Sequence, residues 1–238
     1  IAERGQQTKV PIITLFQRHW YLVVLAALVF VGNGTLGYMT TGGFLNNYAI
    51  SQQNLDTTSV LVAATVAAVV WFFSTLLAGY LADIIGRRNT FLIGFALQAA
   101  VVFPVFWLVS HAGLPGLYVA LVLISTGLGL TYGPLASWYA EIFPASIRFS
   151  GVSITYAIGA VFGGAFAPMI SQMLLDATGS TAAVSGYLLT ATLLGAAATL
   201  CLRDRSGIPL GPDNEAEQAS GATMFSPGKP PATLADAR

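Results

Sequence analysis

The chain has 238 residues, of which 55% are hydrophobic and 8% are charged, and its mean hydropathy is +0.71. Soluble domains carry about 25% charged residues, so this composition excludes an ordinary soluble enzyme. Ten Lys and Arg residues balance ten Asp and Glu residues, and the lack of a basic surplus argues against nucleic acid as a partner.

Long stretches without Asp, Glu, Lys or Arg follow one another along the chain. They cover residues 19–55, 57–82, 89–140, 149–175 and 177–202. One membrane crossing needs about 20 apolar residues, so most stretches fit one helix and the longest fits two, with a turn at 110–116. The runs are too long and too continuously apolar for the alternating strands, about 10 residues each, of a membrane β-barrel.

In chain order, the expected helices cover residues 20–44, 58–81, 90–109, 117–141, 150–175 and 182–202. Lipid offers no hydrogen-bond partners to the backbone, and a helix pairs its backbone N–H and C=O groups internally. The sequence therefore predicts an all-α membrane protein, with a bundle of six transmembrane helices over 20–202.

The basic residues indicate the orientation of this bundle, because cytoplasmic loops carry an excess of Lys and Arg. All of them fall before the first helix or after an even-numbered one, at Arg4, Lys9, Arg18, Arg87, Arg88, Arg148, Arg203, Arg205, Lys229 and Arg238. We therefore expect a multi-pass protein with both termini in the cytoplasm.

The two ends of the chain lie outside the expected bundle. Residues 1–19 lack the pattern of a cleavable signal peptide and are expected to form a cytoplasmic leading segment. The start at Ile1 favours a chain that begins within a longer product. Residues 206–238 hold five Pro, four Gly and three Ser, a composition that buries too little apolar surface to fold. We expect a disordered cytoplasmic tail over 203–238.

Polar side chains within the expected helices are candidates for lining a solute cavity. Asn33 and Tyr38 lie in the middle of the first helix beside glycines, and Tyr132 and Tyr156 lie in the fourth and fifth helices. These groups lose solvation against lipid, so we expect them to face protein or water. Hydrogen bonding between helices, about 0.6 kcal/mol per contact, explains them equally well.

The clearest cluster of charge follows the second helix, in the segment GYLADIIGRR. Asp83 lies four residues before Arg87, close enough to pair with it if the turn stays helical. Gly86 allows a tight reversal because it takes positive φ cheaply, and Gly79 offers a close approach to a neighbouring helix. Arg87 and Arg88 by themselves are also explained by the orientation rule for basic loops.

A second charged segment, EIFPASIR, begins at Glu141 and ends at Arg148. Pro144 ends the fourth helix, which places Glu141 at a helix C-terminus, where a negative charge is unfavourable. It needs a cation, and Arg148, Arg87 and Arg88 lie on the same side of the membrane. The sequence predicts a cytoplasmic charge network between the two loops, able to latch one conformation.

The expected membrane interior holds no carboxylate, Lys or Arg. A proton-coupled pump usually needs one there, so we expect the coupling residue of a proton-coupled transporter to lie outside this chain. The sequence also lacks catalytic and metal-binding motifs such as HExxH and GxSxG. We expect no catalytic residue, metal or cofactor.

These motifs together resemble the major facilitator superfamily, specifically its C-terminal six-helix half. The segment GYLADIIGRR is similar to the superfamily's signature loop, which follows the second helix of each half. A more specific resemblance, to the metabolite:proton symporter family, rests on FQRHW at 16–20, YGP at 132–134, AEIFP at 140–144, Arg148, SGVS at 150–153, Tyr156 and GG at 163–164.

The resemblance implies one half of a twelve-helix carrier in a bacterial plasma (inner) membrane, which works by alternating access. The missing partner is then an N-terminal six-helix half, in which the proton-coupling charges are expected. By resemblance, Asp83, Arg87 and Arg88 form the conformational latch, with Glu141 and Arg148 as its partners. The implied function is secondary transport, by proton symport, of a small polar metabolite of the organic-acid or the betaine and amino-acid class.

Three other functions remain open from the residues alone. A six-helix chain without transport activity would act as a membrane scaffold or assembly protein. An integral membrane enzyme would need a catalytic constellation, which the sequence lacks. A channel would differ from a carrier by giving single-channel currents.

Overall fold

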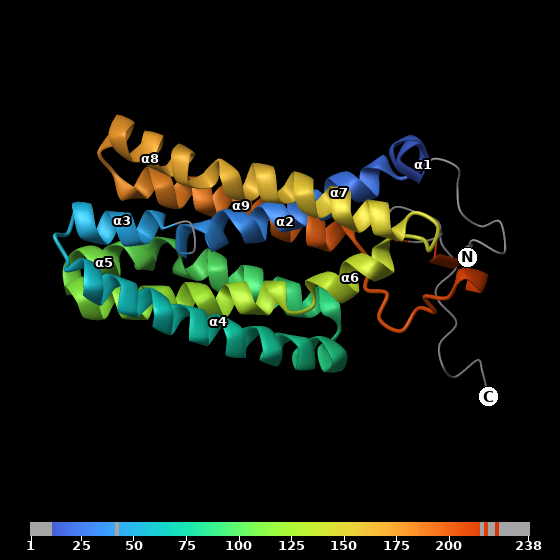
Figure 1. Cartoon of the computed structure of the whole chain (residues 1–238), viewed down its shortest axis with the longest axis horizontal. Helices are drawn as coiled ribbons and strands as arrows, with labels where there is room; N and C mark the ends of the chain where they lie inside the picture. Colours follow the sequence, from blue (N-terminus) through green and yellow to red (C-terminus); the bar gives the residue numbers. More distant parts are fainter. Residues whose placement is uncertain (1–10, 41–42, 215–216, 219–221, 224–238) are drawn as a thin grey trace.

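The structure is a computed structural model that describes residues 11–40, 43–214, 217–218 and 222–223. In these residues the chain forms helices laid along one long axis (Figure 1), with one isolated β-bridge between Leu202 and Thr223. The helices are α1 (Pro11–Arg18), α2 (Trp20–Thr40), α3 (Phe44–Ser51), α4 (Thr57–Ile85), α5 (Arg87–Tyr132), α6 (Leu135–Ile142), α7 (Arg148–Ala160), the π-helical turn η2 (Val161–Ala165), α8 (Ala167–Thr178), α9 (Thr181–Cys201) and the short 3₁₀ turn η3 (Pro212–Asn214). The expected all-α fold is confirmed.

Helix α5 contains two of the expected crossings, joined at Gly113. This glycine has φ 57° and ψ −133°, a conformation that strains residues with a Cβ atom. The two limbs then run side by side, and Gln98 Nε2 of the first donates a hydrogen bond of 3.1 Å to Thr131 Oγ1 of the second.

Five helical stretches of the described chain are long and apolar enough to cross a membrane. They are Trp20–Ser51, Thr57–Ile85, Arg87–Ile142, Arg148–Thr178 and Thr181–Cys201. Because Arg87–Ile142 reverses its direction at Gly113, these stretches supply the six crossings that the charge pattern predicted.

Local signals explain where helix α4 and helix α6 begin and end. The Asp56 side chain caps α4, because its Oδ2 accepts hydrogen bonds from Ser59 N at 2.8 Å and from Ser59 Oγ at 3.0 Å. α4 continues to Ile85, about one turn beyond its expected end. α6 ends at Ile142, and Phe143 before Pro144 is extended, with φ −100° and ψ 134°.

Small residues bring helix backbones close together. The expected helix 150–175 is divided by η2, where a Cβ on Gly163 would come within 2.6 Å of Val31 Cα on α2. A Cβ on Gly32 of α2 would lie 2.8 Å from the Cα of Gly195 on α9. Such contacts let helices pack tightly in lipid, where apolar side chains gain little by leaving the solvent.

Large apolar side chains cover the outer face of α4. Leu61, Phe72, Phe73 and Leu76 each expose more than half of their surface. Soluble monomers rarely expose an apolar patch of this kind, whereas a helix in a bilayer presents such residues to lipid. This face therefore agrees with the expected contact with the membrane.

The segment after α9 differs from the expected disordered tail. Arg205 is 6% exposed, and its guanidinium donates hydrogen bonds to the carbonyl oxygens of Gln218 at 2.6 Å and Glu217 at 2.7 Å. Gln218 is 1% exposed, and its Oε1 accepts a hydrogen bond of 2.8 Å from Ala145 N. Buried hydrogen bonds thus hold this segment against the bundle, together with the buried apolar side chains of Ile208 and Ala222. Residues 224–238 and the leading residues 1–10 lie outside the described part of the chain.

Candidate functional site

A cavity of about 220 Å³ lies where α2, α4, α5 and α7 converge. The residues that line it are Phe30, Asn33, Gly34, Gly37, Tyr38, Trp71, Leu128, Tyr132 and Tyr156. The four residues predicted to line a solute cavity, Asn33, Tyr38, Tyr132 and Tyr156, are all among them. The structure thus brings these four side chains together, and their contact with a solute remains a prediction.

A buried polar chain supports one wall of this cavity. Asn33 is 3% exposed, and its Oδ1 accepts a hydrogen bond of 2.6 Å from Thr131 Oγ1. Thr131 in turn accepts from Gln98 Nε2 at 3.1 Å. Hydrogen bonding between helices was one of the two explanations that the sequence allowed for Asn33. The structure shows such a bond, and it is made by the amide oxygen of Asn33.

Aromatic rings form most of the remaining wall. The rings of Trp71 and Tyr132 meet edge to face, with centroids 5.6 Å apart, and those of Phe30 and Tyr156 lie 4.4 Å apart. Tyr132 and Tyr156 line the same cavity. Tyr38 packs directly on Gly164 of η2, where a Cβ would overlap its ring. The rings are thus held by neighbours from several helices.

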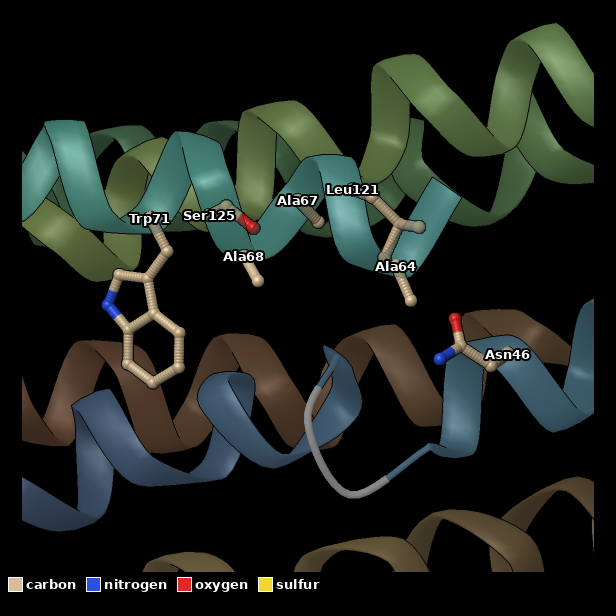
Figure 2. Close-up of a pocket in the computed structure, with 7 residues that line it drawn as sticks. All are labelled: Asn46, Ala64, Ala67, Ala68, Trp71, Leu121 and Ser125. Atoms are coloured by element: carbon tan, nitrogen blue, oxygen red, sulfur yellow. The ribbon is translucent and has the colours of Figure 1, made fainter. Parts of the chain in front are cut away.

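Trp71 separates this cavity from a second one of about 210 Å³. Figure 2 shows the second cavity, lined by α4 and α5 on one side, with Asn46 of α3 at the end away from Trp71. In the described chain, Trp71 Nε1 and Asn46 Oδ1 are both buried without a hydrogen-bond partner. Buried polar atoms of this kind are rare in native structures and need an explanation.

Sequence reasoning missed Trp71 and Asn46 as site residues. Both are polar groups inside apolar stretches, which is the same signal that selected Asn33 and Tyr38. Asn46 lies beyond the expected end of the first helix, so its place in a second short helix, α3, was not foreseen.

The second candidate feature is the end of the bundle at which α4 meets α5 and α6 meets α7, here called the charged end. Arg87 Nη2 and Glu141 Oε1 form an ion pair of 3.2 Å. Glu141 is 4% exposed, and its Oε2 is buried without a hydrogen-bond partner in the described residues. Arg205 Nη1 approaches the backbone carbonyl of Glu141 at 3.5 Å. The two loops that the sequence linked are therefore in contact, through one nearly buried pair.

Asp83 is placed differently from expectation. Its side chain is exposed, and in the described chain it forms no ion pair with Arg87. The reason is that α4 ends at Ile85, and Gly86, at φ 89° and ψ 154°, turns the backbone out of the helix, so the four-residue spacing no longer brings the two side chains together. Asp83 and Arg87 are thus not paired directly in this conformation.

The Asp204 carboxylate lies beside Gly86, a contact that the sequence did not predict. Its Oδ2 accepts a hydrogen bond of 3.1 Å from the backbone N–H of Arg88, at the N-terminus of α5, where a negative charge is favourable. A Cβ on Gly86 would overlap this carboxylate. Gly79 lies inside α4, and its backbone N would be 3.0 Å from a Cβ on Gly133, the residue after α5, so a neighbouring helix end does come close at Gly79. The residue whose missing Cβ permits this approach is Gly133, because a Cβ on Gly79 would meet no atom within 4 Å.

Arg148 is held by backbone and amide oxygens of two segments. Its guanidinium donates to Phe143 O at 3.2 Å, to Leu210 O at 3.1 Å and to Gln218 Oε1 at 2.9 Å. Arg88 Nη2 similarly donates to Leu200 O at 3.0 Å. The five predicted latch residues therefore lie at one end of the bundle, and their role as a latch remains a prediction.

No group of three or more His, Cys, Asp or Glu side chains that could hold a metal ion occurs in the described part of the chain.

The chain is similar to known proteins over most of its length. The model of the Major Facilitator Superfamily matches residues 2–168 and, in an overlapping match, residues 36–234. The inner membrane metabolite transport protein YhjE of Escherichia coli (strain K12) is 31% identical over 204 residues, which are 82% of this chain and 46% of that protein. The citrate-proton symporter of Klebsiella pneumoniae is 28% identical over 190 residues, which are 79% of this chain and 43% of that protein.

The ectoine/proline transporter ProP of Corynebacterium glutamicum is 24% identical over 196 residues, which are 82% of this chain and 39% of that protein. The chain thus spans about half the length, or less, of these relatives.

Proposed function

Because this chain belongs to the Major Facilitator Superfamily, a family of solute transporters and not of enzymes, we propose that it forms the C-terminal six-helix half of a twelve-helix carrier. Its described helices supply six apolar crossings, and it covers 46% of the Escherichia coli relative. The partner is then a second six-helix body, and the two work by alternating access.

The cavity between α2, α4, α5 and α7 is the observation that carries this proposal. Its volume of about 220 Å³ lies below the range of roughly 300–1,000 Å³ typical of drug-sized ligands, so a small metabolite fits it. We assign solute contacts to Asn33, Tyr38, Tyr132 and Tyr156. The candidate solutes are organic acids, betaines and amino acids, which include the citrate and proline named for two relatives.

Proton symport is the coupling that we propose. One relative is a citrate-proton symporter, and none of the residues that line this cavity is an Asp, Glu, Lys, Arg or His. A proton-carrying group at membrane depth is then supplied by the other half of the carrier.

The charged end is proposed to face the cytoplasm, with both chain termini, in a plasma (inner) membrane. Residues 1–19 and 203–238 then lie on that side. There Arg87 and Glu141 act as the latch, together with Asp83, Arg88 and Arg148, and hold one conformation until solute and proton have bound.

Uptake by the whole carrier in proteoliposomes tests this function. We expect flux of one metabolite class that rises when the outer pH is lowered and stops when a protonophore is added. Asn33→Ala is expected to lower the uptake rate at least about tenfold, because it removes a polar group of the cavity and the acceptor of the buried Thr131 hydroxyl. Thr65→Ala, on the exposed face of α4, is the matched control and should leave uptake unchanged. A folded carrier that moves none of these solutes would instead support the scaffold alternative.

A further inference from the structure

We propose that Gln98 is a positioning residue, which acts through Thr131 to hold the Asn33 amide with its N–H donors turned towards the solute cavity. Gln98 lies on the first limb of α5 and is not among the residues that line the cavity. This inference rests on the proposed function, and it names a residue outside the cavity that determines what one of its walls offers to a solute.

The three side chains form one chain of hydrogen bonds, here called the amide relay. Gln98 Nε2 donates to Thr131 Oγ1 at 3.1 Å, and Thr131 Oγ1 donates to Asn33 Oδ1 at 2.6 Å. Asn33 is 3% exposed and the other two residues are fully buried, so water does not compete for these bonds. Linked hydrogen bonds in an interior of low dielectric polarise and strengthen one another.

The distances indicate the direction of the amide relay. Bonds with an O–H donor are typically about 2.5–3.0 Å long, whereas bonds with an N–H donor are about 2.7–3.2 Å long. The 2.6 Å between Thr131 Oγ1 and Asn33 Oδ1 therefore fits a hydroxyl donor better than an amide donor, and the 3.1 Å from Gln98 fits an amide donor. The oxygen of Asn33 is thus used within the protein, and its Nδ2 donors remain for the cavity.

Thr131 has competing acceptors for its single hydroxyl proton. The backbone oxygens of Leu128 and Gly127 lie 3.0 Å and 3.2 Å from Thr131 Oγ1. If the proton went to one of them, the hydroxyl could instead accept from Asn33 Nδ2, and the amide would present its oxygen to the cavity. Donation from Gln98 makes the hydroxyl a stronger donor to Asn33. With Gln98 in place, this wall therefore offers N–H donors to a solute.

The second limb of α5 holds Gln98 in place for this role. A Cβ on Gly127 would lie 2.8 Å from Gln98 Cγ, so the missing side chain at Gly127 makes room for the glutamine. Gln98 Oε1 is buried and has no hydrogen-bond partner within the described ranges, which costs free energy. A side chain that served packing alone would carry no such cost, and the unpaired oxygen therefore supports a role for the Nε2 donor.

Hydrogen exchange at the Asn33 side chain tests the amide relay without a solute. The 238-residue chain is labelled with ¹⁵N-asparagine in detergent micelles, and the Asn33 signal is identified by its loss in Asn33→Ala. In the parent chain we expect both Nδ2 protons to exchange with D₂O, because they face the cavity. In Gln98→Met the amide turns and one Nδ2 proton binds Thr131, so exchange of that proton should slow at least about fivefold.

Two further variants separate the amide relay from an effect on packing. Adding Thr131→Val to Gln98→Met should abolish the slowing, because no hydroxyl remains for the turned amide to bind. Gln172→Met is the matched control, since it removes an amide of α8 that donates to Asp176 at 2.8 Å, outside the relay. It should leave the Asn33 signal unchanged.

Three results would overturn the amide relay. They are slow exchange of an Asn33 Nδ2 proton in the parent chain, which needs no variant, unchanged exchange in a folded Gln98→Met chain, and slowing that persists in the double variant. Circular dichroism of each variant shows whether it is folded.

Uptake separates the amide relay from the proposed function. Citrate and proline are the probes for the whole carrier, and Gln98→Met should raise the KM of a transported probe at least about fivefold with little change in the maximal rate. A purely structural defect would lower the maximal rate instead. Transport with an unchanged KM overturns the role of Gln98 alone. A folded carrier that transports none of the proposed metabolites overturns the transport function, and the exchange experiment still decides the relay.

Discussion

Replacing Arg87 with Met tests whether the Arg87–Glu141 pair stabilises the observed conformation. The two atoms Arg87 Nη2 and Glu141 Oε1 are 3.2 Å apart, and the side chains are 16% and 5% exposed, so water screens the pair only weakly. Removing Arg87 leaves a buried carboxylate whose Oε2 already lacks a partner in the described chain.

Breaking a buried pair by removing one partner costs about 3–5 kcal/mol. We take the lower limit, about 3 kcal/mol, because the Arg87 side chain retains some exposure. For a chain of this size about 1 kcal/mol shifts the midpoint of thermal unfolding by about 2–4 °C, so Arg87→Met should lower the Tm by about 6–12 °C.

The assay is thermal unfolding in detergent, followed by circular dichroism. Adding Glu141→Gln to Arg87→Met should recover more than half of the loss, because the neutral amide removes the buried charge. Arg18→Met, at an exposed arginine in the last turn of α1, is the control and should shift the Tm little. If Arg87→Met behaves like this control, or if the double variant is less stable than the single one, the pair does not stabilise this conformation.

Three further predictions concern the turn of α5, the start of α4 and the segment after α9. Gly113→Ala should destabilise the chain by about 1–3 kcal/mol. The cause would be the positive φ alone, because a Cβ at Gly113 would meet no atom within 4 Å. Gly186→Ala is the control in the same unfolding assay and should be neutral or stabilising, because a Cβ there is also unobstructed and φ is not strained. Hydrogen bonds from Ser59 hold the pKa of Asp56 below its usual value, so its stabilising effect is fully present above the pKa of the unfolded chain and is lost as the pH falls through the lower folded pKa. Asp56→Asn should therefore retain its cap in acid, where the unfolding midpoint of the parent chain falls towards that of Asp56→Ala. Gln218→Ala should speed trypsin cleavage of the segment after α9, seen by mass spectrometry, because it removes buried hydrogen bonds worth about 1–3 kcal/mol; an unchanged rate would show that other contacts hold the segment.

The sequence predicted those features that depend on neighbouring residues. Uninterrupted apolar stretches located the crossings, Pro144 located the end of α6, and the comparisons confirm the family predicted from the signature loop. The same local reasoning placed Asn33 and Tyr38 in a shared cavity, because polar groups in apolar helices have few other places to go.

Features that depend on distant residues were not foreseen. Arg88 pairs through its backbone with Asp204, 116 positions away, and no spacing rule links the two. The segment is ordered despite its Pro- and Gly-rich composition, because the buried Gln218 Oε1 accepts hydrogen bonds from Ala145 N and Arg148 Nη2. The exposed position of Asp83 follows from the backbone of Gly86, whose effect on side-chain direction cannot be read from residue types alone.

The segment after α9 has a mechanical consequence for the whole bundle. The segment begins at Leu202, after α9. Near its start, Asp204 accepts a hydrogen bond from the first turn of α5. Further along, Gln218 accepts hydrogen bonds from the corner between α6 and α7. This short tether limits how far α9 can separate from α5, α6 and α7. Separation of α9 from the first turn of α5 or from the corner between α6 and α7 would therefore first require the tether to detach.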